Sequence, residues 1–112
     1  MTLSLKQRQA LQQNYLYLTS EKLPDLVRDG KIASPVTENH CFQRIVLDNV
    51  CDGQWTQFMS SPAYLVMSDS QLVQAESMCL DVISGKLDLF ALNRNSLLWR
   101  KKIKDKQLTL FN

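Results

Sequence analysis

The sequence predicts an all-α protein, a single compact domain of four or five helices with a short extended C-terminal tail. Apolar residues recur at helical spacing behind sequence signals for helix starts and stops. The three glycines and three prolines fall where helices should begin or end, and the apolar–polar alternation typical of strands is almost absent. We therefore expect a helical domain over residues 1–104, a tail over residues 105–112 and no sheet of more than two short strands.

The first two helices are predicted from the residues at their ends. Ser4 and Gln7 have the spacing of a capping box, so a helix is expected over residues 4–18. Its apolar residues recur at i, i+4 and i+7, namely Leu11, Tyr15 and Leu18. A short second helix is expected to hold Pro24 in its first turn and to end just before Gly30.

A third helix is expected to begin at the N-cap Thr37 and to run to about Asp52, with Gly53 as its left-handed stop. One apolar stripe marks its buried face, and this stripe consists of Phe42, Ile45, Val46 and Val50. The segment that follows is the least regular of the chain, and its Trp55 and Phe58 indicate a buried helical turn.

The last two helices differ in how clearly the sequence predicts them. Ser68 and Gln71 form a second capping-box match, which predicts a helix that ends near Gly85. A final helix is expected over residues 86–104, with an interruption at residues 93–96 as the alternative. Its apolar residues surround the axis, so it should be central or should contact a second surface. The residues expected in the core are Phe42, Ile45, Val46, Leu72, Cys79, Val82 and Phe90.

Composition and missing motifs exclude several classes of function. The chain has 13 Lys and Arg against 11 Asp and Glu, a balance that does not suit a protein covered in bound nucleic acid. The sequence contains no glycine-rich phosphate loop, no zinc-protease motif and no nucleophile elbow, and its one histidine and three widely spaced cysteines argue against a zinc site. We therefore expect no metal and no cofactor. Without a membrane-spanning run or a secretory signal, the protein should be cytoplasmic with no membrane contact, and its thiols (Cys41, Cys51 and Cys79) should stay reduced.

One polar cluster on the third helix is a candidate site. His40, Arg44 and Asp48 follow at i, i+4 and i+8, so they share a face opposite the apolar stripe. In one interpretation His40 transfers protons, Arg44 binds an anion and Cys41 acts as a nucleophile. In the other, Arg44 and Asp48 are solvent-accessible and form an ion pair worth only a few tenths of a kcal/mol. We favour the second, because adjacent helical residues project about 100° apart, which keeps His40 from activating Cys41 easily.

A basic stretch ends the predicted domain. Five of seven consecutive residues are cationic, namely Arg100, Lys101, Lys102, Lys104 and Lys106. One interpretation is the C-terminal end of a helix, where the helix dipole favours positive charge. The alternative is weak contact with nucleic-acid phosphates.

The C-terminal end carries the most specific motif. The residues Gln107-Leu108-Thr109-Leu110-Phe111 follow the charged stretch, so we expect them to protrude, although they include three large apolar side chains. They resemble the QLxLF peptide by which many bacterial replication and repair proteins dock on the DNA polymerase sliding clamp. In that family the glutamine fills one subsite, and the leucines and the phenylalanine fill an adjoining apolar pocket. All four fixed positions match, so the resemblance implies clamp binding through Gln107, Leu108, Leu110 and Phe111.

Three hypotheses follow for the function. The resemblance favours a non-enzymatic adaptor or accessory protein that docks on the clamp during DNA replication or repair. The alternative is a helical module for protein or DNA interaction, whose tail packs on its own domain as an edge strand or an apolar plug. A small enzyme that uses the face of His40 and Arg44 is the third. The blocks Glu38–Phe42 and Ser96–Arg100 resemble small bacterial proteins without an assigned activity, so they add no function.

Overall fold

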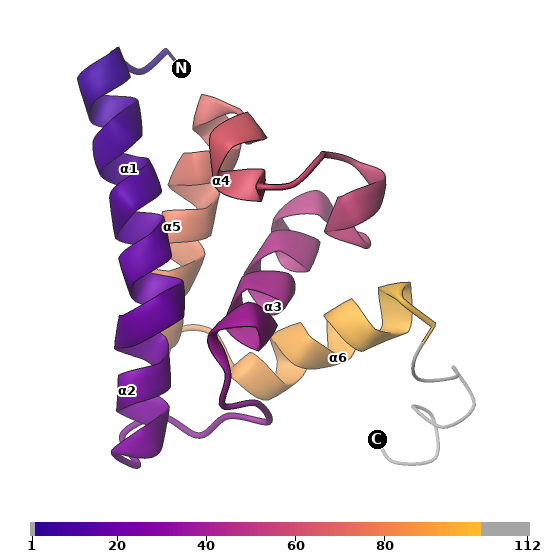
Figure 1. Ribbon diagram of the computed structural model, residues 1–112. Coiled ribbons are helices and arrows are strands. Elements are labelled where there is room, and N and C mark those ends of the chain that lie inside the picture. Colours follow the sequence, from indigo (N-terminus) through magenta and orange to yellow (C-terminus); the bar gives the residue numbers. More distant parts are fainter. Residues whose placement is uncertain (1, 102–112) are drawn as a thin grey trace.

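The computed structural model describes residues 2–101, and every regular element in this range is a helix (Figure 1). The predicted all-α class is therefore confirmed. Because the first three helical segments run on as one rod, residues 2–101 contain five separate helices and one short 3-10 turn. Within the same range, no helix combines the length and apolar character that a membrane span requires. The predicted tail, residues 105–112, lies outside the described residues.

The rod at the N-terminal end consists of α1 (Leu5–Tyr17), a π-helical turn η1 (Leu18–Lys22) and α2 (Leu23–Arg28). The two helices predicted here are present, but they are joined instead of separate. Proline lacks an N–H and its ring crowds the preceding turn, so Pro24 disturbs regular α-helical bonding at this point. The wider π turn directly before it accommodates this disturbance without breaking the rod. Gly30, at a φ of +74°, follows the end of α2 as expected.

Both predicted capping boxes are confirmed. Before α1, the Ser4 hydroxyl accepts a hydrogen bond from the Gln7 N–H at 3.1 Å, and the Gln7 side chain accepts one from the Ser4 N–H at 2.9 Å. Before α5 (Asp69–Ile83), Ser68 and Gln71 repeat the same reciprocal pair at the same distances. These two helix starts depend only on residues three positions apart, which is why the sequence located them closely.

The central helix, α3 (Asn39–Cys51), begins and ends one residue away from the predicted caps. Its N-cap is Glu38 and not Thr37, and no side chain caps it. At the other end Asp52, with a φ of 53°, takes the left-handed conformation that was expected of Gly53. Aspartate is among the few residues with a side chain that adopt this conformation readily.

Two short elements, η2 (Trp55–Gln57) and α4 (Ala63–Val66), connect α3 to α5. Trp55 is half-buried against the core, but Phe58 is exposed, so the predicted buried turn is only partly correct. The Phe58 ring instead lies over Gly53, where an added Cβ would come within 2.8 Å of ring atom Cε2. A side chain at position 53 would therefore require the exposed Phe58 ring to move, and the left-handed residue of this turn is Asp52 and not Gly53.

The last helix, α6 (Leu89–Trp99), is shorter than predicted. It begins after Asp88, whose carboxylate accepts a hydrogen bond from the Phe90 N–H at 3.1 Å and so caps the helix. It passes without a break through residues 93–96, so the alternative of an interruption there is wrong. Beyond its end, Lys101 has a left-handed φ of 59°.

The core lies around α3, which packs against α6, α5 and the π turn, while α1 runs alongside α5 (Figure 1). Most of the predicted core residues are buried, namely Phe42, Ile45, Val46, Leu72, Cys79 and Val82. The prediction for Phe90 is wrong, because this residue is 46 % exposed. Its neighbours Leu89 and Leu92 occupy the buried face of α6, and Phe90 lies on another side of that helix.

Asp69, at the start of α5, ties the N-terminal segment to the body. Its carboxylate accepts hydrogen bonds from the Leu3 N–H at 2.8 Å and from Arg8 Nη1 at 2.9 Å. These two donors hold the pKa of the Asp69 carboxyl below its ordinary value, and the Leu3 N–H has the larger effect. The ionised form of Asp69 therefore stabilises the contact between α1 and α5.

A pair of phenylalanine variants tests the core. Phe42→Ala should lower the free energy of unfolding by about 3–5 kcal/mol, because it leaves a cavity beneath the central helix. Phe90→Ala should cost less than about 1 kcal/mol, because nearly half of that ring is already in water. Urea unfolding followed by circular dichroism measures both values. Equal losses in the two variants would contradict this description of the core.

The Asp69 contacts predict a defined acid dependence. Because the folded state lowers the pKa of Asp69, its contribution is complete above the ordinary carboxyl value of about 3.9 and is lost as the pH falls through the lower folded value. Asp69→Asn should therefore reduce stability at neutral pH and flatten the dependence of the unfolding midpoint on pH in the acid range. Asp25→Asn, which removes a surface carboxylate paired with Arg28, is the control. An unchanged acid dependence in Asp69→Asn would refute this assignment.

Candidate functional site

Two residues of the predicted polar cluster on α3, Arg44 and Asp48, face another helix and not solvent. Asp48, expected to be solvent-accessible, has 0 % of its surface exposed, and Arg44 is half-buried. Both side chains point toward α6, whose polar residues cover this side of α3. The expectation of a solvated face is therefore wrong, because helical spacing identifies a shared face but not what covers it.

Asp48 is the centre of a hydrogen-bond network between α3 and α6. Its Oδ2 accepts hydrogen bonds from Ser96 Oγ at 2.6 Å and from Arg100 Nε at 2.7 Å. Its Oδ1 accepts from the Trp55 backbone N–H at 2.9 Å and from Arg100 Nη2 at 3.1 Å. With both oxygens occupied and the charge matched by a guanidinium, this carboxylate is suited to hold structure together and has no free oxygen for proton transfer.

Arg44 joins the same network through Ser96 and does not pair with Asp48. Its Nη1 donates to Ser96 Oγ at 2.7 Å, and its Nη2 donates to Asn93 Oδ1 at 2.9 Å. The predicted ion pair between Arg44 and Asp48 is therefore absent from the described contacts. Ser96 lies between the two side chains, accepts from the first and donates to the second, which explains why a serine is fully buried in α6.

A second link joins the same two helices through Asn49 and Asn95, the neighbours of Asp48 and Ser96 in the sequence. Asn49 Nδ2 donates to the backbone oxygens of Ile45 at 2.8 Å and of Leu92 at 2.9 Å. Asn95 Nδ2 donates to Asn49 Oδ1 at 3.1 Å. Asn93, Asn95 and Ser96 of α6 thus all take part in the packing of this helix on α3.

The other two members of the predicted cluster are separate from this network. The His40 side chain is 70 % exposed, and its Nδ1 lies 3.4 Å from a carboxylate oxygen of Glu38. Cys41 is half-buried on α3. Within residues 2–101, no side-chain hydrogen bond connects His40 or Cys41 to Arg44 or Asp48. The four residues therefore do not form the arrangement that the catalytic interpretation required.

The three cysteines are free thiols, and the pKa of two of them is raised, which lowers the fraction of reactive thiolate. Burial raises the pKa of Cys79 to about 12, so this thiol stays protonated in the core. Burial, with Asp48 nearby, also raises the pKa of Cys51. Among the described residues, no group of three or more histidine, cysteine and acidic side chains is arranged to hold a metal ion.

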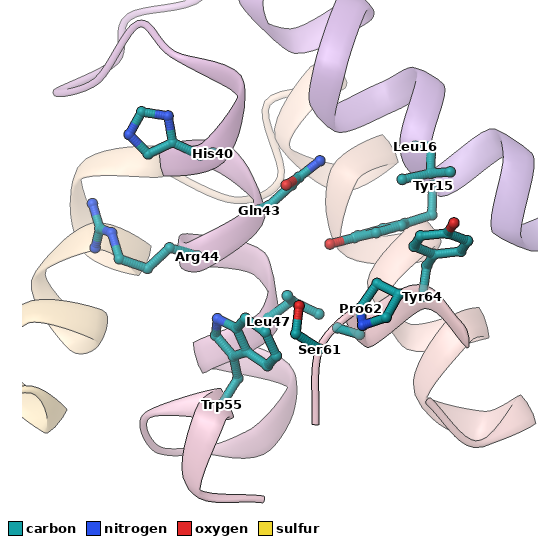
Figure 2. Close-up of a pocket in the computed structure, with 11 residues that line it drawn as sticks. Tyr15, Leu16, His40, Gln43, Arg44, Leu47, Trp55, Ser61, Pro62 and Tyr64 are labelled. Carbon is teal, nitrogen blue, oxygen red and sulfur yellow. The ribbon is translucent and has the colours of Figure 1, made fainter. Parts of the chain in front are cut away.

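A pocket of about 260 Å³ opens between α1, α3, η2 and α4 (Figure 2). Trp55, Pro62 and Tyr64 provide flat apolar walls. Arg44 and His40 lie at one side, and among residues 2–101 no aspartate or glutamate lines the space. The full lining consists of Tyr15, Leu16, His40, Gln43, Arg44, Leu47, Trp55, Ser61, Pro62, Ala63 and Tyr64.

The Tyr15 hydroxyl gives this pocket a polar floor. Figure 2 shows the Tyr15 ring extending from α1 so that its oxygen points into the pocket, toward α3. The residue is only 2 % exposed, and no group of residues 2–101 is hydrogen-bonded to its hydroxyl. Burial raises the pKa of Tyr15, so the hydroxyl keeps its proton and can donate a hydrogen bond.

Sequence reasoning did not find this pocket. Tyr15 was assigned only to the apolar stripe of the first helix, and Trp55 only to a buried turn. The sequence did contain one sign of a polar site, which is the tyrosine in the apolar stripe of the first helix. A tyrosine hydroxyl near the core usually has a hydrogen-bond partner. Its position in space depends on segments far apart in the chain.

The other predicted site residues are those of the basic stretch and of the C-terminal motif, and only the first two of them lie within the described residues. Arg100 is bound to Asp48, and Lys101 is exposed. Three further cations of the predicted basic stretch lie outside the described residues, namely Lys102, Lys104 and Lys106. The same holds for the predicted clamp-binding residues, namely Gln107, Leu108, Leu110 and Phe111.

Removing the charge of Asp48 tests the network. Asp48→Asn should lower the free energy of unfolding by about 3–5 kcal/mol, because the half-buried guanidinium of Arg100 loses its partner. The control is Asp25→Asn, whose exposed pair with Arg28 should change stability by less than about 0.5 kcal/mol. Chemical denaturation measures both. A loss below about 1 kcal/mol for Asp48→Asn would show that the network is not essential to the packing.

Comparisons of the chain with protein-family models, with curated proteins and with solved structures give no match.

Proposed function

We propose that this protein is a non-enzymatic adaptor that docks on the bacterial DNA polymerase sliding clamp through its C-terminal residues 107–111. The observation that carries the proposal is the sequence Gln-Leu-Thr-Leu-Phe, which matches all four fixed positions of the QLxLF clamp-binding peptide. The motif contains two leucines and a phenylalanine, and burial of such large apolar side chains in a partner's pocket is favourable.

The helical body, residues 2–101, supports this proposal because its last described turn is anchored to the core. Arg100 makes two hydrogen bonds to the buried carboxylate of Asp48, so the last described turn is held firmly. Residues 2–101 also have their own core, in which no buried side-chain nitrogen or oxygen lacks a partner. A peptide that begins after such an anchored point can serve a partner without loosening the body.

The expected affinity follows from the two terminal anchors. Leu110 and Phe111 would each contribute about 1.5–3 kcal/mol if the clamp buries them fully. Ordering the peptide offsets part of this gain, so binding near the micromolar range, about −8 kcal/mol, is expected. A closed-ring clamp presents several copies of its pocket, so a dimeric body would gain avidity and a monomer would not.

The cations before the peptide add a term that depends on salt. Lys101 is exposed, and Lys102, Lys104 and Lys106 come before the motif in the sequence. A protein docked on the clamp would hold these lysines near the encircled DNA, where they can contact phosphates. Arg100 does not join them, because Asp48 holds its guanidinium.

Clamp titration tests the proposal directly. The intact protein should bind purified clamp near the micromolar range, and Leu110→Ala/Phe111→Ala should abolish binding at about 100 μM. Thr109→Ala is the matched control, because it changes the variable position of the motif and should keep full affinity. Calorimetry or fluorescence anisotropy measures each affinity.

Two outcomes would contradict the adaptor function. The first is an intact protein that does not bind at about 100 μM clamp, and the second is a double variant that binds as tightly as the intact protein. DNA-loaded clamp, compared at low and high salt, isolates the contribution of the lysines. Affinity that falls with salt only when DNA is present would assign that contribution to phosphate contacts.

A further inference from the structure

The pocket between α1, α3, η2 and α4 has the features of a ligand site. Its volume of about 260 Å³ is below the range of roughly 300–1,000 Å³ typical of pockets for drug-sized molecules. One ring system can therefore enter, whereas a folded peptide element cannot. The walls from Trp55, Pro62 and Tyr64 present flat surfaces, which favour a planar ring that can stack.

The polar floor of the pocket defines the edge of that ring. The Tyr15 hydroxyl points into the space, and within residues 2–101 it has no hydrogen-bond partner, although the residue is almost wholly buried. No buried side-chain oxygen of the described residues lacks a partner, so the unpartnered Tyr15 oxygen is itself open to the pocket, where it is expected to meet a water molecule or a ligand atom. Because it keeps its proton, Tyr15 suits a ligand that offers a carbonyl oxygen.

Gln43 supplies the complementary group. Its amide Nε2 lies 3.4 Å from Thr19 Oγ1 and 3.3 Å from Ser20 Oγ, both on the π turn η1. These contacts orient the amide, and its carbonyl oxygen has no partner within the part of the chain that the structure describes. The Thr19 hydroxyl is itself fixed, because it donates to the Tyr15 carbonyl at 2.9 Å. The π turn thus orients Gln43, and turns of this kind are frequent at functional sites.

Charge restricts the ligand further. No carboxylate from the described part of the chain lines the pocket, whereas Arg44 and His40 lie at one side. A cationic ligand would have no counter-charge here, so a neutral ring is favoured, and a negative substituent outside the pocket would be tolerated.

We propose that this pocket binds a planar heteroaromatic ring with adjacent carbonyl and N–H groups, as found in a pyrimidine base, stacked between the aromatic walls. The carbonyl accepts a hydrogen bond from Tyr15, and the N–H donates to Gln43. Such a base can come from a free nucleoside or from an unstacked nucleotide of single-stranded DNA, since both present the same edge. This inference does not rest on clamp binding by the tail.

Thymidine, N3-methylthymidine and a short oligothymidylate are the probes, each added to the full-length protein. The protein has two tryptophans, so their indole N–H signals in NMR spectra report separately on Trp55 in the pocket wall and on Trp99 in α6. Thymidine at about 1 mM should move the Trp55 signal and leave the Trp99 signal in place. N3-methylthymidine should move neither tryptophan signal, because its methyl group replaces the N–H hydrogen that would be donated to Gln43.

Tyr15→Phe removes the hydroxyl and keeps the ring. It should weaken binding of thymidine about three- to tenfold, the effect of one neutral hydrogen bond, while the unfolding midpoint stays at that of the unaltered protein. Unchanged unfolding is expected because the hydroxyl is hydrogen-bonded to no other described group, so its removal breaks no bond within the body. Tyr17→Phe is the matched control, because the Tyr17 ring is exposed outside this pocket and its loss should leave binding unchanged.

The results distinguish the sources of the base and can overturn the proposal. Tighter, salt-sensitive binding of oligothymidylate per base would assign the site to single-stranded DNA, and equal, salt-insensitive binding would assign it to a free nucleoside. The proposal is wrong if neither probe moves the Trp55 signal at about 1 mM base. It is also wrong if Tyr15→Phe or N3-methylation leaves affinity unchanged. Clamp titration of Tyr15→Phe should match the unaltered protein, which separates failure of this site from failure of the tail.

Discussion

The carboxylate of Asp48 fixes how the C-terminal half of the body is assembled. A charge with no exposed surface is costly unless opposite charge and hydrogen bonds surround it. Asp48 meets this requirement with Ser96 and Arg100, which lie one helical turn apart on α6. Because only one placement of α6 along α3 brings both donors to the carboxylate, the pair sets the register of the two helices. The backbone N–H of Trp55 completes the arrangement and fixes the turn that follows α3.

Local sequence signals predicted most of the fold, because each depends on a few neighbouring residues. The capping boxes at Ser4 and Ser68 are reciprocal bonds across three positions, and both helices begin where expected. The stripe of α3 was buried as predicted for the same reason, since its spacing alone defines one face. Where prediction erred by one residue, at Asp52, a second residue type was able to adopt the same left-handed backbone.

The polar groups were not predictable in the same way, because their partners are far away in the sequence. Arg44 and Asp48 are four residues apart, a spacing typical of a surface ion pair, yet each binds α6 residues about fifty positions away. The error for Phe90 has the same origin, because the apolar residues around α6 outnumber the buried positions that α3 offers. The pocket depends on tertiary contacts most strongly, since Tyr15, Gln43 and Trp55 come from separate elements.

The two proposed binding regions share one structural element, which determines whether they can influence each other. The Asp48 carboxylate accepts a hydrogen bond from the backbone N–H of Trp55, a wall of the pocket. It also accepts one from the side chain of Arg100, the residue before the exposed Lys101. A ligand changes a distant affinity only if it binds two conformations differently. A fully paired, buried carboxylate favours one conformation, because any shift of α6 would leave a charge unpartnered. The network therefore favours independent sites, because the contacts of Arg100 with Asp48 should be the same whether or not the pocket is occupied.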